Sequence, residues 1–376
     1  MALLYEWVCR MTLHNYWWLI IWPLLFGGAS AVLIPKREEY VLGKKETRWH
    51  WIPALILVLP FVIWAAWREN AFGDTGTYRT QFFMAPSSLS NLSAYLDSQP
   101  KDKGFALITI IFKSLISRSD IAYFFMFAAI QMFLLVLTYR KYSSNFWLSF
   151  FLFVASADYL SWMHNGMRQF LVVTILLALL PLIIQRRYLL MVIITLILST
   201  VHLSTLIFLP FIFVINGKAW NYRTLLFIFA VIISTFFIDR ITGVITNAME
   251  DTAYSGDIYH FVNDDGSNII RVLFYSIPTV MSLAFKRYID AADDPMINLC
   301  TNLSIVSAGF YVVSYFTSGI LIGRIPIFFS LANYILIPWI IKQAFSQKSA
   351  FFLQTAFATV YTAYFYYQVG IAWGLI

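Results

Sequence analysis

The sequence predicts an all-α integral membrane protein, a polytopic bundle of about 12 transmembrane segments, some of them short or re-entrant. Of the 376 residues, 60% are hydrophobic and only 12% are charged, whereas a soluble domain is nearer half apolar and one quarter charged. Apolar runs of about 17–21 residues recur along the chain, which is the length that a helix needs to cross a bilayer. The Lys and Arg residues lie in short stretches between these runs, so the net charge of +7 indicates membrane orientation rather than a nucleic-acid partner.

The apolar runs predict one polytopic domain, residues 1–376, in which the lipid bilayer is itself a partner. Its spans are expected at 16–35, 50–67, 120–139, 145–164, 168–185, 188–200, 204–215, 224–239, 269–285, 296–316, 325–342 and 350–372. Charge then orients them. Six short loops hold 15 of the 26 Lys and Arg residues but 6 of the 19 Asp and Glu residues, so we expect these loops to be cytoplasmic. They are 36–48, 140–141, 186–187, 218–223, 286–287 (with the acidic residues counted through Asp294) and 342–348.

Residues 188–215 fit this scheme least well. They are too long for one simple span and short for two, because 13 helical residues reach roughly 20 Å of a hydrocarbon core of roughly 30 Å. Yet both flanks are basic. We favour two short or re-entrant segments that meet near Val201-His202-Leu203-Ser204, since irregular backbone is tolerated at membrane depth where it lines a protein cavity. The alternative is one long tilted helix.

Two external loops are long, 68–119 and 240–268. The first contains the apolar piece Phe105–Arg118, which Lys113 interrupts. This piece is too short for a span, and we predict an external amphipathic helix. The second loop is acidic and rich in turn residues, which suits a lid over a site and a solvated connector equally. The two cysteines, Cys9 and Cys300, form no metal-binding pattern, and we predict neither a metal nor a cofactor.

Unusual polar residues gather at the predicted outer face. Arg68, Arg168 and Arg324 each lie at the end of a different span, and three spans that place a guanidinium at one level indicate an anion site, because the guanidinium fork suits phosphate oxygens. His202 lies at the expected helix break, where a base is as reasonable as an interior histidine. Trp162 is a candidate to stack on a sugar ring, or else part of an interfacial aromatic belt.

Five short motifs occur in an order that resembles the EpsG/Wzy-type polysaccharide polymerases of bacterial exopolysaccharide, capsule and O-antigen assembly. They are Arg68 with Asp74-Thr75-Gly76-Thr77-Tyr78, then Asp102-Lys103-Gly104-Phe105, Asn165-Gly166-Met167-Arg168-Gln169, His202-Leu203-Ser204, and Arg324 before an aromatic span. Two features depart from the family pattern. Gly73 directly precedes Asp74, and Asp102 stands where Glu is usual.

The resemblance implies glycosyl transfer at the periplasmic or extracellular face of the bacterial cytoplasmic membrane, in a fold compatible with a GT-C-like arrangement. A growing glycan would pass from a polyprenyl-diphosphate (undecaprenyl-diphosphate) carrier to the non-reducing end of a new lipid-linked repeat unit. The implied partners are the polyprenyl-diphosphate-linked oligosaccharide, a flippase and a chain-length regulator. The expected catalytic residues are Asp74, His202 and Arg168. The expected substrate-binding residues are Arg68, Tyr78, Asn165, Gln169, Ser204, Arg324 and Trp162.

The base that accepts the proton of the sugar hydroxyl is either Asp74 or His202. We favour Asp74, since it lies in a turn-rich external segment. Four other functions stay open: a glycosyltransferase that uses a polyprenyl-monophosphate sugar, a lipid-linked glycan flippase, a ligase, and a scaffold without chemistry. The sequence shows no internal repeat of the kind that many transporters carry.

Overall fold

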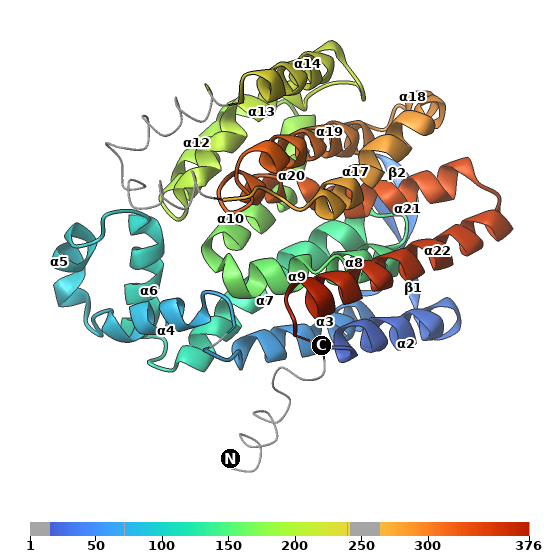
Figure 1. Cartoon of the computed structure of the whole chain (residues 1–376). Helices are drawn as coiled ribbons and strands as arrows, with labels where there is room; N and C mark the ends of the chain where they lie inside the picture. The colour runs from blue at the N-terminus through green and yellow to red at the C-terminus, as the bar shows by residue number, and fades with distance from the viewer. Residues whose placement is uncertain (1–15, 71, 239, 241–263, 376) are drawn as a thin grey trace. The chain divides into compact units, whose positions relative to one another are not determined.

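The computed structural model describes residues 16–70, 72–238, 240 and 264–375, which are helical almost throughout (Figure 1). The chain folds as two compact units, and the single polytopic domain expected from the sequence stays a prediction. Unit 1 consists of Met1–Gln99, Lys103–Ala178 and Phe345–Ile376, and unit 2 of Pro100–Asp102 and Leu179–Ala344. Each is described by itself.

Unit 1 is organised around α7 (Asp120–Tyr142), whose 23 residues extend about 34 Å. In chain order the other elements are α2 (Trp18–Leu33), β1 (Lys36–Val41), β2 (Lys44–Trp49), α3 (Trp51–Ala66), α4 (Thr75–Met84), η1 (Leu89–Asn91), α5 (Leu92–Asp97), α6 (Lys103–Leu115), α8 (Phe146–Ala155), α9 (Asp158–Leu160), η2 (Ser161–Asn165), α10 (Met167–Ala178), α22 (Gln347–Phe365) and η6 (Tyr366–Ala372). Helices α3 and α10 pack along α7. Because α7 is long, the polar residues near its two ends form two separate groups.

One group, which we call the hairpin end, consists of β1, β2 and residues 140–145. Arg140 pairs with Glu39 through two nitrogen–oxygen contacts of 2.8 and 2.9 Å, and Arg48 donates to the carbonyl of Lys141 at 2.8 Å. The loops 36–48 and 140–141, both expected to be cytoplasmic, therefore lie together. The other group, the site end, consists of residues 68–70, 72–79 and 163–169 with the first turn of α7.

The antiparallel hairpin of β1 and β2 is absent from the all-α prediction. Val41 pairs with Lys44, so the loop is Leu42-Gly43, and both residues have positive φ values of 49° and 80°. Two-residue hairpin loops of this kind match the twist of the strands. The strands carry mostly charged residues rather than an apolar alternation, which is why periodicity did not reveal them.

Unit 2 is organised around α19 (Pro295–Phe316), whose 22 residues extend about 33 Å. The other elements are α11 (Leu180–Ile184), α12 (Tyr188–Ser199), η3 (Leu203–Ile207), α13 (Phe208–Val214), α14 (Tyr222–Phe236), α17 (Ile269–Ala284), α18 (Lys286–Ala292), η5 (Ile322–Arg324), α20 (Ile327–Ser330) and α21 (Asn333–Ala344). At the start of α19, Asn298 and Asn302 accept the backbone N–H groups of Ala219 and Trp220. At its end, Ser314 bonds Ser267. The predicted inner and outer loops of unit 2 thus lie at opposite ends of α19.

The hairpin predicted for 188–215 is confirmed as a fold. The chain leaves helical conformation at His202 (φ −153°, ψ 112°), and η3 and α13 turn back along α12. Asn216 donates a 2.6 Å hydrogen bond to the hydroxyl of Tyr188, so the two flanks of the segment lie together. One long tilted helix would separate these residues by the full length of the segment, and that alternative is wrong.

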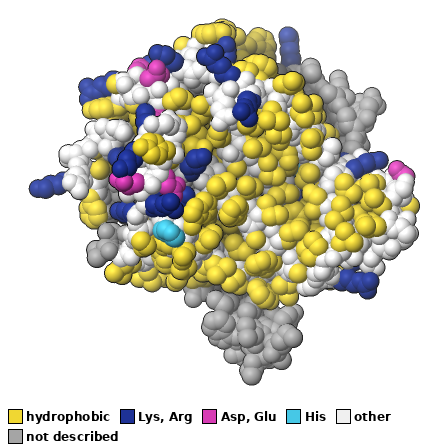
Figure 2. All heavy atoms as spheres, turned by 180° about the vertical axis from the view of Figure 1, so that it is seen from behind, with side chains coloured by type: hydrophobic (Ala, Val, Ile, Leu, Met, Phe, Trp, Pro, Cys, Tyr) yellow, Lys and Arg dark blue, Asp and Glu magenta, His cyan; other side chains and the backbone are white. Residues whose placement is uncertain are grey.

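The described helices support an all-α membrane protein without confirming 12 spans. Two are long and apolar enough to cross a bilayer, α7 and α19. Three bent pairs raise the number to five if each pair counts as one span, among them Phe146–Ala155 with Asp158–Asn165, which meet at 68°. Six further apolar helices have 10–17 residues. Hydrophobic side chains cover much of the surface seen in Figure 2, and on α14 Leu225, Phe229, Ile232 and Phe236 are all exposed, as a lipid-facing surface requires.

The expected amphipathic helix is α6. Its inner face buries Phe105, Ile110 and Phe112, while Ile111 and Leu115 are exposed. Lys113, the residue that interrupts the apolar run, donates to the carbonyls of Phe82 and Phe83 at the end of α4, so it connects α6 to α4. The acidic loop that could act as a lid, 240–268, lies mostly outside the described residues, which resume at Asp264.

Candidate active site

Arg68 is buried just beyond the end of α3. It donates from Nε to the carbonyl of Ala65 and from Nη1 to the carbonyl of Met163, both at 2.6 Å, and its guanidinium lies 4.6 Å from the ring centre of Phe124. Its Nη2 has no hydrogen-bond partner among the described residues. Burial lowers the pKa of the Arg68 guanidinium to about 10, so it stays charged at neutral pH. Arg68 therefore connects the end of α3 to the segment around Met163, and one of its N–H donors stays without a partner among the described residues.

Arg79 is a member of the site end that the sequence analysis did not single out. It pairs with Asp120, the first residue of α7, at 2.6 Å, and it donates to the carbonyl of Arg68 and to the side chain of Asn70. Its guanidinium lies 5.4 Å from the centre of the Phe124 ring, the same ring that Arg68 covers. The sequence held one signal for this pair: Asp120 is an acidic residue in the first turn of a predicted span, where the helix dipole favours a negative charge.

Arg168 lies in the first turn of α10 beside two aromatic rings. Its guanidinium carbon is 5.6 Å from the ring centres of both Tyr78 and Phe105. Burial raises the pKa of the Tyr78 phenol, while a hydrogen bond from Arg168 works against that shift. Tyr78 therefore stays a neutral phenol. Three sequence motifs that are far apart in the chain thus converge around one half-buried guanidinium.

Asp74 and Asn165 are brought to the same place by Gly73. Gly73 has a φ of +55°, and a Cβ added there would lie 3.1 Å from the Cβ of Asn165. The position needs glycine both for its left-handed backbone and for this close approach. The unusual placement of Gly73 directly before Asp74 is explained, because the glycine allows this turn to approach Asn165 before the start of α10. Asp74 is half-buried and acts electrostatically on Tyr78.

Trp162 and Gln169 are buried rather than open to a substrate. Trp162 is 4% exposed and donates from Nε1 to Asp158 at 3.3 Å, so a sugar would reach its ring only if the ring became exposed. Gln169 lies in the same turn of α10 as Arg168 and is also 4% exposed. His164 is buried nearby among the rings of Trp64 and Phe72. These side chains are part of the buried packing beneath the site end.

His202, Ser204 and Arg324 belong to unit 2. His202 Nδ1 lies 3.9 Å from a carboxylate oxygen of Asp102, and the buried hydroxyl of Ser204 has no hydrogen-bond partner among the described residues. Arg324 ends η5 and is exposed. The neighbouring segment is held by Asp264, which accepts from the hydroxyl of Ser318 and the N–H of Ile320 at 2.6 and 2.7 Å.

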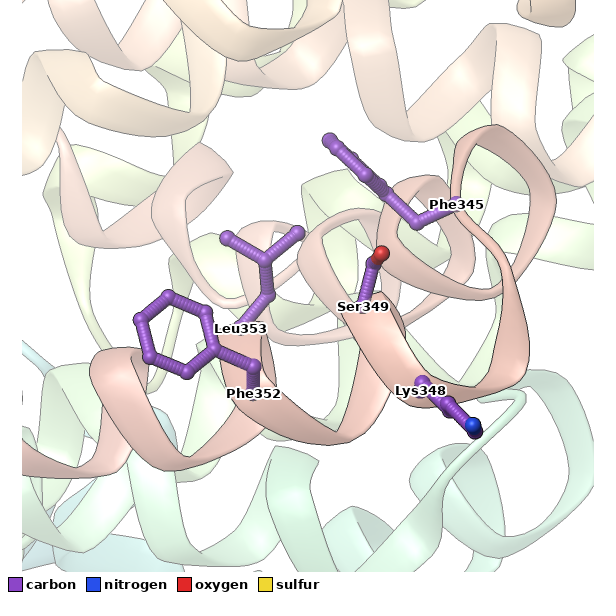
Figure 3. Close-up of a pocket in the computed structure, with 5 residues that line it drawn as sticks. All are labelled: Phe345, Lys348, Ser349, Phe352 and Leu353. Atoms are coloured by element: carbon purple, nitrogen blue, oxygen red, sulfur yellow. The ribbon is translucent and has the colours of Figure 1, made fainter.

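A surface hollow of about 430 Å³ lies elsewhere in unit 1, at the start of α22 (Figure 3). Its lining is Phe345, Lys348, Ser349, Phe352 and Leu353, and it contains none of the expected site residues. With one lysine and no acid or histidine in its lining, it offers no pair of groups for acid–base chemistry. Among the residues that the structure describes, no three His, Cys, Asp or Glu side chains group as a metal ion requires. Metal independence stays a prediction.

The fold and these residues define a helical membrane protein whose polar groups collect at the ends of long apolar helices. The model of the EpsG family matches residues 51–373. The chain therefore belongs to the EpsG family, a family of Wzy-type polysaccharide polymerases, and the resemblance seen in the sequence motifs is confirmed. The comparisons with curated proteins and with solved structures gave no match.

Proposed function

We propose that this membrane protein polymerises a polysaccharide by moving a growing glycan from a polyprenyl-diphosphate carrier to a new lipid-linked repeat unit. The proposal rests mainly on Arg168, which Tyr78 and Phe105 hold at the end of a span beside Asp74 and Asn165. The family supports a polysaccharide polymerase, and the chemistry of these side chains supports the carrier.

The leaving group in this reaction is a diphosphate, so negative charge develops on its oxygens. A guanidinium presents two parallel N–H donors to such oxygens and keeps its charge at any physiological pH. The two aromatic rings restrict the movement of Arg168, which lowers the entropy lost when it binds a substrate. Within unit 1, the remaining Nη2 donor of Arg68 is the further donor that we propose for the carrier. A role for Arg324 in carrier binding stays a prediction from the sequence motif.

The acceptor is a sugar hydroxyl, which needs a base as it attacks the anomeric carbon. Asp74 and His202 remain the candidates. Asp74 acts electrostatically on Tyr78, the phenol beside Arg168, so it lies in the neighbourhood of the proposed anion site. His202 lies beside a buried carboxylate, and this orients an imidazole for proton transfer. The unpartnered hydroxyl of Ser204, two residues further on, is a donor that the acceptor sugar could use.

We place the site end outside the membrane, because the hairpin end at the opposite end of α7 carries the basic loops. Tyr40, 77% exposed on β1, and Ser90, exposed in η1, are suitable labelling positions. In a Cys9→Ser background, an impermeant maleimide should label the Ser90→Cys protein in intact cells. It should label the Tyr40→Cys protein only after the cells are opened. The reverse pattern would invert the proposed topology.

The reaction is tested by reconstitution. Purified protein in liposomes is mixed with one synthetic polyprenyl-diphosphate repeat unit, and the products are analysed by mass spectrometry. We expect a ladder spaced by the mass of the repeat, absent from the Arg168→Ala protein and present in the Arg287→Ala protein. Arg287 is a matched control, since it too follows a predicted span and lies over an aromatic ring, that of Tyr288.

A polyprenyl-monophosphate sugar as donor is the second candidate. Asp74 follows the predicted span 50–67 in an external segment, where glycosyltransferases of that kind carry an acidic residue. A product formed with the monophosphate donor but not with the diphosphate donor would favour this candidate. Transfer of an unaltered substrate across the bilayer would favour a flippase instead.

A further inference from the structure

We propose that Asp102 is a positioning residue that orients His202 as the base of the reaction, and this inference rests on the proposed function. Asp102 would hold the imidazole with Nδ1–H towards the carboxylate. The opposite nitrogen, Nε2, is then the proton acceptor for the sugar hydroxyl. Both residues belong to unit 2, although they lie far apart along the chain.

The backbone places His202 at a break between helices. Helix α12 ends at Ser199, and His202 is extended before η3 begins at Leu203. The hydroxyl and the N–H of Thr205 both bond the carbonyl of His202, at 2.6 and 3.1 Å. The backbone of His202 is therefore fixed, and its side chain projects from a position that a regular helix would not provide.

Asp102 contacts this break with both of its carboxylate oxygens. Oδ1 accepts the backbone N–H of Leu203 at 3.1 Å, and Oδ2 lies 3.9 Å from His202 Nδ1. The Asp102 side chain is 3% exposed, so its charge is largely removed from water and favours a nearby N–H donor. Asp102 has a φ of +57°, a conformation that Asp and Asn tolerate better than other side chains with a Cβ.

The two nitrogens of His202 lie in different surroundings. Nδ1 is buried and has no hydrogen-bond partner among the described residues, while one fifth of the whole side chain is exposed. The separation of 3.9 Å between Nδ1 and the carboxylate exceeds a hydrogen bond. Contacts of this kind are often long in a protein without substrate and shorten when it binds. The buried nitrogen faces the carboxylate, which leaves Nε2 for the acceptor.

In the proposed step, the lone pair of the sugar oxygen forms a bond to the anomeric carbon of the donor as the O–H proton passes to Nε2. The bond between the anomeric carbon and the diphosphate oxygen breaks, and its electron pair leaves with the diphosphate. The imidazolium that forms is stabilised by the Asp102 carboxylate. It returns its proton to solvent or to the leaving diphosphate, so atoms and charge balance.

The Asp102→Asn variant distinguishes two possible roles of Asp102: orienting His202 and supporting the backbone. Asparagine keeps a carbonyl oxygen for the Leu203 N–H and tolerates the positive φ, but it removes the negative charge. Asp102→Ala removes both. If Asp102 acts through His202, both variants should lower kcat about 10- to 100-fold with little change in the KM for the donor. If Asp102 only supports the backbone, the Asn variant should keep wild-type kcat, and that result would overturn the proposal.

A double-variant cycle adds a second requirement. In a His202→Gln background, Asp102→Asn should cause no further loss of kcat, since the residue through which it acts is gone. Additive losses from the two substitutions would show that Asp102 acts independently of His202 and would contradict the inference.

A third measurement is independent of whether the substrate is the proposed polyprenyl-diphosphate donor. The side-chain ¹⁵N chemical shifts of His202, assigned by their loss in the His202→Gln protein, report which nitrogen carries the proton. We expect the Nδ1–H tautomer in the wild type and a shift towards Nε2–H in Asp102→Asn. An Nε2–H tautomer in the wild type would sink the inference. If polymerisation fails with a diphosphate donor while these shifts appear as expected, the proposed function is wrong and the orientation of His202 by Asp102 stands.

Discussion

At the hairpin end of unit 1, Arg140 is neutralised by the carboxylate of Glu39 and covers the ring of Trp51 at 4.2 Å. At the site end, Arg68 is held by two backbone carbonyls, and Arg168 lies against the rings of Tyr78 and Phe105. Both ends use arginine at the end of α7 or of a neighbouring helix. The difference is that the chain supplies a carboxylate partner to Arg140, whereas Arg68 donates to two uncharged carbonyls and keeps an Nη2 donor without a partner among the described residues.

This comparison shows why an arginine at the end of a span is weak evidence when taken alone. Arg140 and Arg68 look alike in the sequence, since each lies at the boundary of an apolar run. The partner decides whether the charge is satisfied within the protein or available to a substrate. Substitutions at the two ends should therefore separate activity from stability.

The largest effect is expected for Arg168. Arg168→Ala should lower the rate of chain extension by at least about 100-fold, because a donor to the developing charge is lost. Arg168→Lys should recover only part of that loss, since an ammonium group cannot bond two oxygens in parallel. The rate of ladder formation in liposomes measures both variants. Chains of wild-type length from the Ala variant would refute a role for Arg168 at the diphosphate.

Asp74→Asn tests the other candidate base. If Asp74 accepts the proton, turnover should fall about 100-fold while the affinity for the donor, measured by binding of a non-transferable analogue, stays unchanged. Equal losses of turnover and binding would assign Asp74 to substrate positioning. A small effect here together with a large effect of His202→Gln would assign the base to His202.

Arg68→Met should mainly lower the stability of the protein rather than its activity. The substitution leaves the carbonyls of Ala65 and Met163 without their donors, and the loss of two charge-assisted hydrogen bonds should cost about 3 kcal/mol of unfolding free energy. Thermal unfolding of the detergent-solubilised protein measures this. Arg118→Ala, at an exposed arginine between α6 and α7, is the control and should unfold like the wild type. An unchanged unfolding temperature in the Met variant would remove the structural role assigned to Arg68.

The smallest effect is expected at Glu39. A hydrogen bond from Arg140 lowers the pKa of the Glu39 carboxyl below its usual range. A carboxyl with a lowered pKa in the folded state stabilises the protein above its unfolded-state pKa, and this contribution disappears as the pH falls through the folded-state value. Glu39→Gln should therefore cost about 1 kcal/mol at pH 7 and progressively less below pH 4, with chain extension unchanged. A loss of polymerisation without a loss of stability would contradict the purely structural role of the hairpin end.

Parts of the site could be predicted because their signal is local. The apolar runs, the turn around Asp74 and the break at His202 each follow from a few neighbouring residues. Arg79 was missed because its partner, Asp120, lies 41 residues further along the chain, and no local pattern links them. The sequence motif included Asp102 but did not show its position beside His202. Trp162 was expected to be accessible from its place near a predicted span end, but its ring is directed into the interior, where it bonds Asp158.

The sequence by itself determined that the chain is a helical membrane protein of the EpsG family, because hydropathy and motif order are properties of consecutive residues. It also determined that residues 188–215 double back, since their length and their two basic flanks are inconsistent with a single crossing. The tertiary structure decided which arginines are satisfied within the chain and which carboxylate faces which base. Those outcomes depend on contacts between residues that lie far apart along the chain. The side chain that contacts a buried charge determines whether that charge supports the fold or binds a substrate.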